Sequence, residues 1–130
     1  MALWKFVESA SKAQKLVSAR LAGQLNHDDV VTFFKEAREA AASIGCGSGD
    51  YCLLIDADDV MVQQQDVVAD FQRALASSSV TARRVAVVTG SALLRMQGRR
   101  VLSAADRGAT FATRREAIEW LLGTDSPPQT

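Results

Sequence analysis

The spacing of hydrophobic residues along the chain changes several times, and each change predicts a new structural element. Residues 3–8 and 15–21 each alternate apolar and polar side chains, a period of two that predicts two β-strands joined by a turn. Between Asn26 and Gly45 the apolar residues recur every three or four positions, which is typical of an amphipathic helix. Asn26 is suited to cap its start and Gly45 its end. The chain is therefore predicted to begin with an antiparallel hairpin followed by a helix.

Two later runs, 51–55 and 84–89, are apolar without alternation, which predicts strands buried on both faces, as in a parallel sheet. A helical pattern follows each run. A short strand at 109–112 then precedes a last helix, which Thr113 and Glu116 begin with a capping-box pattern and Gly123 ends. The inward-facing residues are predicted to be Val67, Phe71, Ala74 and Leu75 in the first of these helices, Leu94, Val101, Leu102 and Ala105 in the second, and Ala117, Trp120 and Leu121 in the last.

The predicted order of elements is β-β-α-β-α-β-α-β-α. Alternating strands and helices with short links imply an α/β protein with a single mixed, mostly parallel sheet, a leading antiparallel hairpin and about four covering helices. A length of 130 residues is typical of one domain. We expect that domain to cover residues 1–123, and residues 124–130, which include Pro127 and Pro128, to form a disordered tail.

This arrangement resembles the bacterial SpoIIAA-like proteins, which share the STAS fold of sporulation anti-sigma-factor antagonists and are related in shape to CRAL-TRIO lipid-binding domains. The segments that carry the resemblance are Leu53-Leu54-Ile55-Asp56-Ala57, Val85-Ala86-Val87-Val88-Thr89, and Phe111-Ala112-Thr113 leading into Glu116-Ala117-Ile118-Glu119-Trp120-Leu121. The resemblance covers about residues 3–122 and implies a STAS-like regulatory or binding module. The antagonists carry a phosphorylatable Ser or Thr after the strand that corresponds to 51–56, whereas residues 57–76 contain neither. The serine phospho-switch is therefore predicted to be missing.

Charge narrows the range of partners. The chain has 15 basic and 15 acidic residues, and this zero net charge argues against a dedicated nucleic-acid binder. The charges are unevenly placed, because eight arginines and a single acid lie between Arg83 and Arg115. Two interpretations are open: a basic patch for phosphate, acidic lipid or an acidic protein face, or solvated helix positions.

The sequence also predicts where in the cell the protein is located and whether it holds a metal. Its longest apolar runs, 52–55 and 85–88, are far shorter than a membrane-spanning helix requires, and the first residues do not resemble a signal peptide. Since His27 is the only histidine, Cys46 and Cys52 are too few for a zinc site, and we expect them to be free thiols. The expectation is a cytoplasmic protein without a metal or cofactor.

Acidic residues follow the strand at 51–55, and they allow two interpretations. Asp56, Asp58 and Asp59 either cap the following helix and solvate a loop, or they carry metal or phosphoryl chemistry. In the second case Asp56-Ala57-Asp58 resembles the motif of haloacid-dehalogenase phosphatases, in which the first Asp attacks phosphorus, the second handles the leaving-group proton, and carboxylates hold Mg²⁺. No lysine beyond Lys35 is present to neutralise the phosphate.

A short polar turn follows the next strand, at Thr89-Gly90-Ser91. It is either an N-cap formed by Ser91, or an anion cradle in which free backbone amides and the helix dipole face a ligand. Arg95 and Arg99 lie one turn apart on the helix that follows.

The adjacent aromatic residues Phe33 and Phe34 bear on whether the protein has a groove or an interface. Both rings cannot point squarely into one core, so one of them is expected to line a groove or an interface, unless a wide apolar stripe buries both.

Together these patterns predict a non-enzymatic binding module that recognises a partner protein or a small anionic or lipidic ligand. A homodimer is a possible form of this module. Ligands of open α/β sheets bind at the carboxyl ends of the strands. The candidate site residues are therefore Asp56, Asp58, Thr89, Gly90, Ser91, Arg95 and Arg99. The alternative is a small Mg²⁺-dependent phosphatase that uses Asp56 and Asp58.

Overall fold

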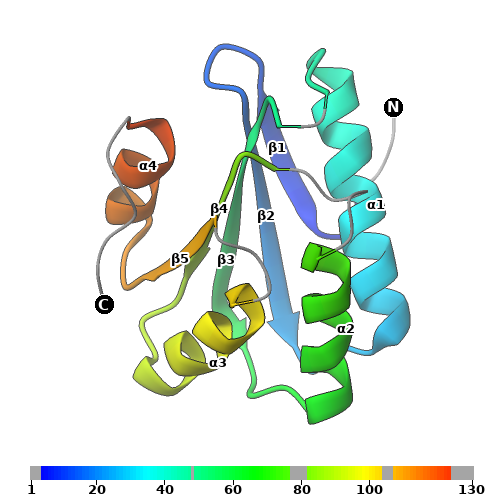
Figure 1. Ribbon diagram of the computed structural model, residues 1–130, viewed down its shortest axis with the longest axis vertical. Coiled ribbons are helices and arrows are strands. Elements are labelled where there is room, and N and C mark those ends of the chain that lie inside the picture. Colours follow the sequence, from blue (N-terminus) through cyan, green and yellow to red (C-terminus); the bar gives the residue numbers. More distant parts are fainter. Residues whose placement is uncertain (1–3, 48, 77–81, 104–106, 124–130) are drawn as a thin grey trace.

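The computed structural model describes residues 4–47, 49–76, 82–103 and 107–123 (Figure 1). Its elements follow the predicted order. Leu3, Ala105 and the predicted tail at 124–130 lie outside the described residues. The elements are β1 (Val7–Ser11), β2 (Leu16–Gly23), α1 (His27–Ser43), β3 (Cys52–Val60), α2 (Gln65–Ala76), β4 (Arg84–Val88), α3 (Ala92–Leu102), β5 (Gly108–Phe111) and α4 (Arg114–Leu122).

The five strands form one sheet in the order β1-β2-β3-β4-β5. β1 pairs antiparallel with β2, and every other neighbouring pair in the sheet is parallel. The parallel pairs arise because each helix carries the chain back to the edge where the preceding strand began. The predicted α/β class, with one mostly parallel sheet and a leading hairpin, is confirmed.

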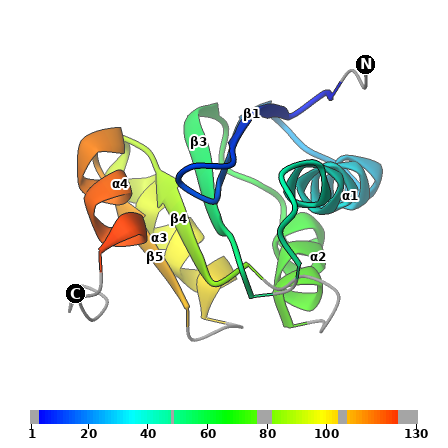
Figure 2. The ribbon, with the colours of Figure 1, turned by 90° about the horizontal axis from the view of Figure 1, so that it is seen from above.

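Helices cover the two faces of this sheet unequally. α1, α2 and α3 pack on one face, called here the three-helix face, and α4 packs on the opposite face, called the α4 face. Figure 2 shows α4 across the sheet from α1 and α2. Neighbouring residues of β3 separate the two cores, because Leu53 belongs to the larger core under three helices and Leu54 to the smaller core under α4. Both side chains are completely buried.

The first strand begins later than the alternation predicts. The pattern predicts a strand over 3–8, whereas β1 covers Val7–Ser11. The cause is Glu36 of α1, whose buried carboxylate accepts hydrogen bonds from the backbone amides of Lys5, Phe6 and Val7 at 2.8, 2.8 and 3.1 Å. The chain before Val7 is therefore bound to a helix side chain before it joins the sheet.

The third strand ends later than predicted, and this corrects one interpretation of the acidic residues. β3 continues to Val60 because residues beyond Ile55 still pair with β2, with Arg20 opposite Asp56 and Gly23 opposite Val60. The aspartates at 56, 58 and 59 are strand residues, and α2 begins only at Gln65. The interpretation that they cap the following helix is wrong.

The predicted helix starts are confirmed at three places. Asn26 forms a reciprocal capping box with Asp29, and the side chains of Ser91 and Thr113 each accept a hydrogen bond from an amide of the first helical turn. Phe33 and Phe34 are both buried, so the apolar stripe of α1 is wide enough to take both rings.

Candidate functional site

The structure brings most of the predicted site residues together at the carboxyl ends of β3 and β4. The carboxylate of Asp58 accepts a hydrogen bond from the backbone amide of Gly90 at 2.8 Å, and that of Asp56 accepts one from the amide of Asp58 at 3.0 Å. One acidic strand end is thereby tied to the polar turn that follows the next strand. The predicted site residues of these two segments therefore lie side by side, and a ligand there stays a prediction.

The polar turn is already occupied by oxygens of the chain itself. Asp58 binds the amide of Gly90, and the hydroxyl of buried Thr89 accepts from the amide of Ser91 at 3.2 Å. Ser91 in turn accepts from the amide of Leu94 at 3.2 Å, as an N-cap does. The N-cap interpretation is confirmed, and an added anion at this turn would meet the negative charge of Asp58.

Arg95 and Arg99 differ although they lie one turn apart on α3. The guanidinium of Arg95 is half-buried and donates to the carbonyl of Thr89 at 2.8 Å, so it stabilises the turn. Arg99 is exposed to solvent. The structure therefore brings Arg95 to the candidate site and leaves Arg99 on the outer side of α3.

A small polar cavity of about 70 Å³ lies on the α4 face beside these acids. Its wall consists of Asp56, Asp58, Val88, Ala112, Thr113 and Arg114. Next to it Arg20 forms an ion pair with Asp59, whose hydrogen bond and charge raise the pKa of the guanidinium. Among the described residues, no group of three or more His, Cys, Asp or Glu side chains is placed to hold a metal ion.

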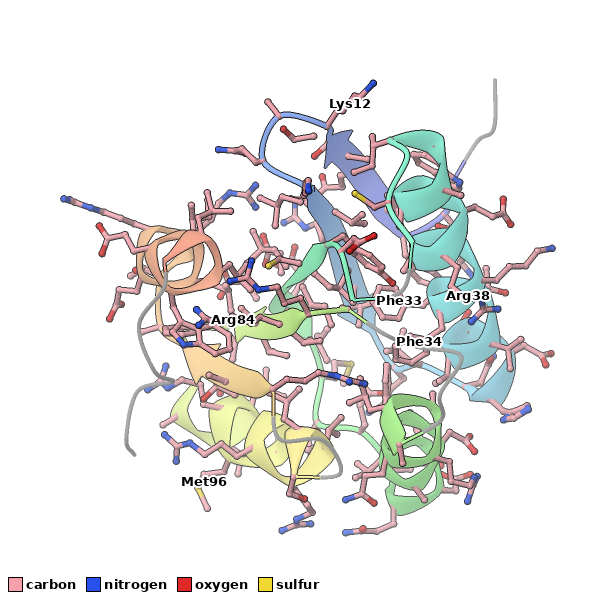
Figure 3. All side chains as sticks on the ribbon, turned by 45° about the horizontal axis from the view of Figure 1, so that its top comes forward. Lys12, Phe33, Phe34, Arg38, Arg84 and Met96 are labelled. Atoms are coloured by element: carbon pink, nitrogen blue, oxygen red, sulfur yellow. The ribbon has the colours of Figure 1, made fainter. Side chains whose placement is uncertain are left out.

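Several of the arginines between Arg83 and Arg115 are bound to groups of the chain itself. Arg84 lies over the ring of Trp120, with its guanidinium carbon 5.2 Å from the ring centre, and donates to the carbonyl of Gly123 at the end of α4 (labelled in Figure 3). Arg107 donates to the carbonyl of Leu75 at the end of α2, and Arg115 pairs with Glu119. Cations placed at helix carboxyl ends stabilise those ends. Arg84 and Arg107 are therefore bound to the ends of two different helices, and the basic patch stays a prediction for the other arginines.

A second cavity, which the sequence analysis did not predict, lies on the three-helix face. This apolar cavity has a volume of about 80 Å³ and is enclosed by β2–β4, α1, α2 and α3. Phe34, Phe71 and Leu75 form part of its wall, and the polar side chains that reach it from the described residues are Gln63 and Gln97. Gly98 lets α3 lie close to the sheet there, because a β-carbon at this position would come within 3.2 Å of Thr110.

The opening of the apolar cavity lies along α3. The wall residues that are only partly buried are Val60, Gln63, Val87, Leu94, Gln97, Gly98 and Val101, four of which belong to α3. Gln63 and Gln97 join the segment between β3 and α2 to α3. The amide of Gln63 donates to the Gln97 side chain, and that side chain donates back to the carbonyl of Gln63, both at 2.9 Å. This reciprocal pair closes one side of the cavity.

The fold is that of the SpoIIAA-like proteins, as comparison with solved structures shows. The chain is similar to an uncharacterized protein from the DUF3478 family with a SpoIIAA-like fold, from Shewanella loihica PV-4. The two structures superpose with a TM-score of 0.62 and 20% sequence identity over 82% of this chain and 83% of that one. No protein-family model and no curated protein matches the chain. Within the described residues, no helix combines the length and apolar character that crossing a membrane requires.

Proposed function

We propose that the protein is a non-enzymatic binding module that holds the apolar end of a small lipidic ligand in the cavity between the sheet, α2 and α3. Supporting this choice is a partly open cavity whose wall is apolar except for two glutamines. Such cavities, with a few polar groups at the opening, are the usual form of small-molecule sites. A cytoplasmic location and the absence of the serine phospho-switch are parts of this proposal.

The size of the apolar cavity limits the ligand. Its volume of about 80 Å³ is roughly half that of an engineered 150 Å³ cavity that binds benzene. The cavity therefore suits the end of an alkyl chain, with the rest of the molecule extending past Gln63 and Gln97. The side-chain amides of both glutamines are already hydrogen-bonded within the chain, so the ligand head would extend past them into solvent.

Two observations favour a lipidic ligand over an anionic one at the strand ends. The amides of the Thr89–Ser91 turn already bind Asp58 and the hydroxyl of Thr89. A ligand anion would have to displace a carboxylate that is already in place, or lie beside it. The same contacts weigh against the phosphatase alternative, because Asp58 is engaged with Gly90 where a proton donor would have to face a substrate.

Titration with a fluorescent fatty acid, undecanoic acid carrying a dansyl group, tests the proposal. We expect saturable binding to the wild-type protein. Val101→Phe places a ring in the opening of the cavity, so its affinity should fall by about tenfold or more, since each excluded methylene weakens binding several-fold. The matched control is Val31→Phe, the same change at an exposed position of α1 outside the cavity. Thermal unfolding of both variants verifies that they fold.

Equal loss of affinity in both variants, or no saturable binding by the wild-type protein, would contradict the proposal. Hydrolysis of a phosphomonoester with Mg²⁺ would overturn it in favour of the enzyme if Asp56→Asn abolished the activity while Asp50→Asn, in the loop before the opposite end of β3, retained it.

A further inference from the structure

We propose that the outer side of α3, together with Met61 and Val62, docks on an anionic lipid bilayer. This inference rests on the proposed function, because the same helix forms the wall of the apolar cavity. Its starting point is the placement of exposed apolar side chains. Six large hydrophobic residues are exposed among those described, and four of them, Met61, Val62, Leu93 and Met96, belong to α3 and the segment before α2.

The outer stripe of α3 combines apolar and basic side chains. Leu93, Met96 and Arg100 follow one another at spacings of three and four residues, which places them on one side of the helix. Leu93 is 58% exposed and Met96 60%, and Arg99 and Arg100 flank them in solvent. Figure 3 shows Met96 pointing away from the sheet. This combination of exposed Leu and Met with neighbouring Arg is typical of helices that lie in a membrane interface.

The charge of this surface complements anionic lipid. The eleven residues of α3 include three arginines and no acid. Of the acids at this end of the molecule, Asp58 binds the amide of Gly90, Asp59 pairs with Arg20, and Asp66 lies in the first turn of α2. Arg99 and Arg100 face solvent, and a lipid phosphate is an anion they can bind bidentately.

Met61 and Val62 extend the apolar part of this surface. They are 58% and 46% exposed and directly precede Gln63, whose backbone is bound to the side chain of Gln97 one turn after Leu93. In Figure 1 this segment and the start of α3 both lie at the lower end of the molecule. Two separate segments thus present apolar side chains at the end where the parallel strands finish.

The position of the apolar cavity favours a bilayer over an acidic protein as the partner. Leu94, Gln97 and Val101 line the cavity from the inner side of α3, while Leu93 and Met96 point outward from the same turns. A bilayer in contact with the outer side of α3 would lie against the opening of the cavity. An alkyl chain could then move between bilayer and cavity without crossing water.

Flotation of the ligand-free protein with vesicles tests the docking. Vesicles of phosphatidylcholine mixed with phosphatidylglycerol should carry the wild-type protein upward, whereas vesicles of phosphatidylcholine alone should carry about tenfold less. Leu93→Ser combined with Met96→Ser should reduce flotation to the level with neutral vesicles, and Arg99→Gln combined with Arg100→Gln should remove its salt dependence. The matched control, Val31→Ser combined with Leu122→Ser, changes two exposed apolar residues elsewhere and should float like the wild type.

Three results overturn the docking: no flotation of the wild type, equal loss in the control, or equal flotation with both kinds of vesicle. Binding to immobilised polyglutamate through Arg99 and Arg100, without flotation, overturns it in favour of an acidic protein partner. Docking on the bilayer and binding of the ligand can be disproved independently, because different variants test them. Val101→Phe should lose the fluorescent fatty acid and keep flotation, and the Leu93 and Met96 double variant should lose flotation and keep the fatty acid.

Discussion

The two faces of the sheet are built in opposite ways. The three-helix face is covered by α1, α2 and α3, and its larger core still contains a cavity of about 80 Å³. In the described part of the chain the α4 face has one helix, and beside that helix lie Arg20, Asp56 and Asp58. Asp56 and Asp58 accept hydrogen bonds from backbone amides, and Arg20 forms an ion pair with Asp59. This difference shows that the carboxylates of an acidic cluster can be engaged by groups of the same chain. Unfilled volume between apolar residues, in contrast, is available to a ligand.

The largest losses of stability are expected for substitutions in the cores of the two faces. Leu54→Ala should lower the free energy of unfolding by about 4 kcal/mol, because Leu54 is completely buried in the smaller core. Leu75 on the three-helix face lines the apolar cavity and lacks neighbours on one side. Leu75→Ala should therefore cost only about 2 kcal/mol. Urea denaturation measures both losses, and a larger loss at Leu75 would show that the cavity wall is packed as tightly as the smaller core.

Smaller losses of stability are expected for two carboxylates, one on each face. Glu36→Ala should cost about 3 kcal/mol, because three buried or half-buried backbone amides lose their acceptor. Asp58→Ala should cost about 1 kcal/mol, since its carboxylate is exposed and water replaces it at the amide of Gly90. Glu39→Ala, an exposed position of the same helix as Glu36, is the control and should change the unfolding free energy little. Equal losses of stability for Glu36→Ala and Asp58→Ala would contradict the expected difference between a buried and an exposed carboxylate.

The smallest expected effect depends on pH and concerns the start of α1, on the three-helix side. A hydrogen bond from Lys5, together with one from the Asn26 backbone, lowers the pKa of Asp29. A lowered pKa means that Asp29 stabilises the fold above the unfolded-state pKa of about 4, and that this contribution disappears as the pH falls through the folded-state value. Asp29→Asn should cost less than about 1 kcal/mol at neutral pH, because the pair is near the surface. In urea denaturation the difference from wild type should vanish near pH 2, and a difference independent of pH would contradict this assignment.

Much of the fold could be predicted because local signals and the global fold agree. The period-two runs became the hairpin, the unalternating runs became parallel strands, and Asn26, Ser91 and Thr113 became helix caps. Each of these features depends on residues close together in the sequence. The extension of β3 to Val60 could not be predicted in this way, since it depends on pairing with β2, about 37 residues earlier.

The candidate site was predicted only in part, for a similar reason. Residue types and strand ends correctly place Asp58 beside Gly90, but they do not reveal that the two are bonded to each other. The apolar cavity leaves no signal in the pattern, because the same hydrophobic stripe describes both a filled and an unfilled space. Phe34 lines the cavity, but Phe33 and Phe34 are both buried, so this adjacent pair did not distinguish a cavity from a packed core.

The carboxylate of Glu36 has a consequence for association between molecules. β1 lies at the edge of the sheet, where unpaired amides are a template for a strand of another chain. At the entrance to that strand Glu36 already binds the amides of Lys5, Phe6 and Val7. A helix side chain thus occupies the amides at the start of this edge strand, so fewer donors there are available to a strand of another chain.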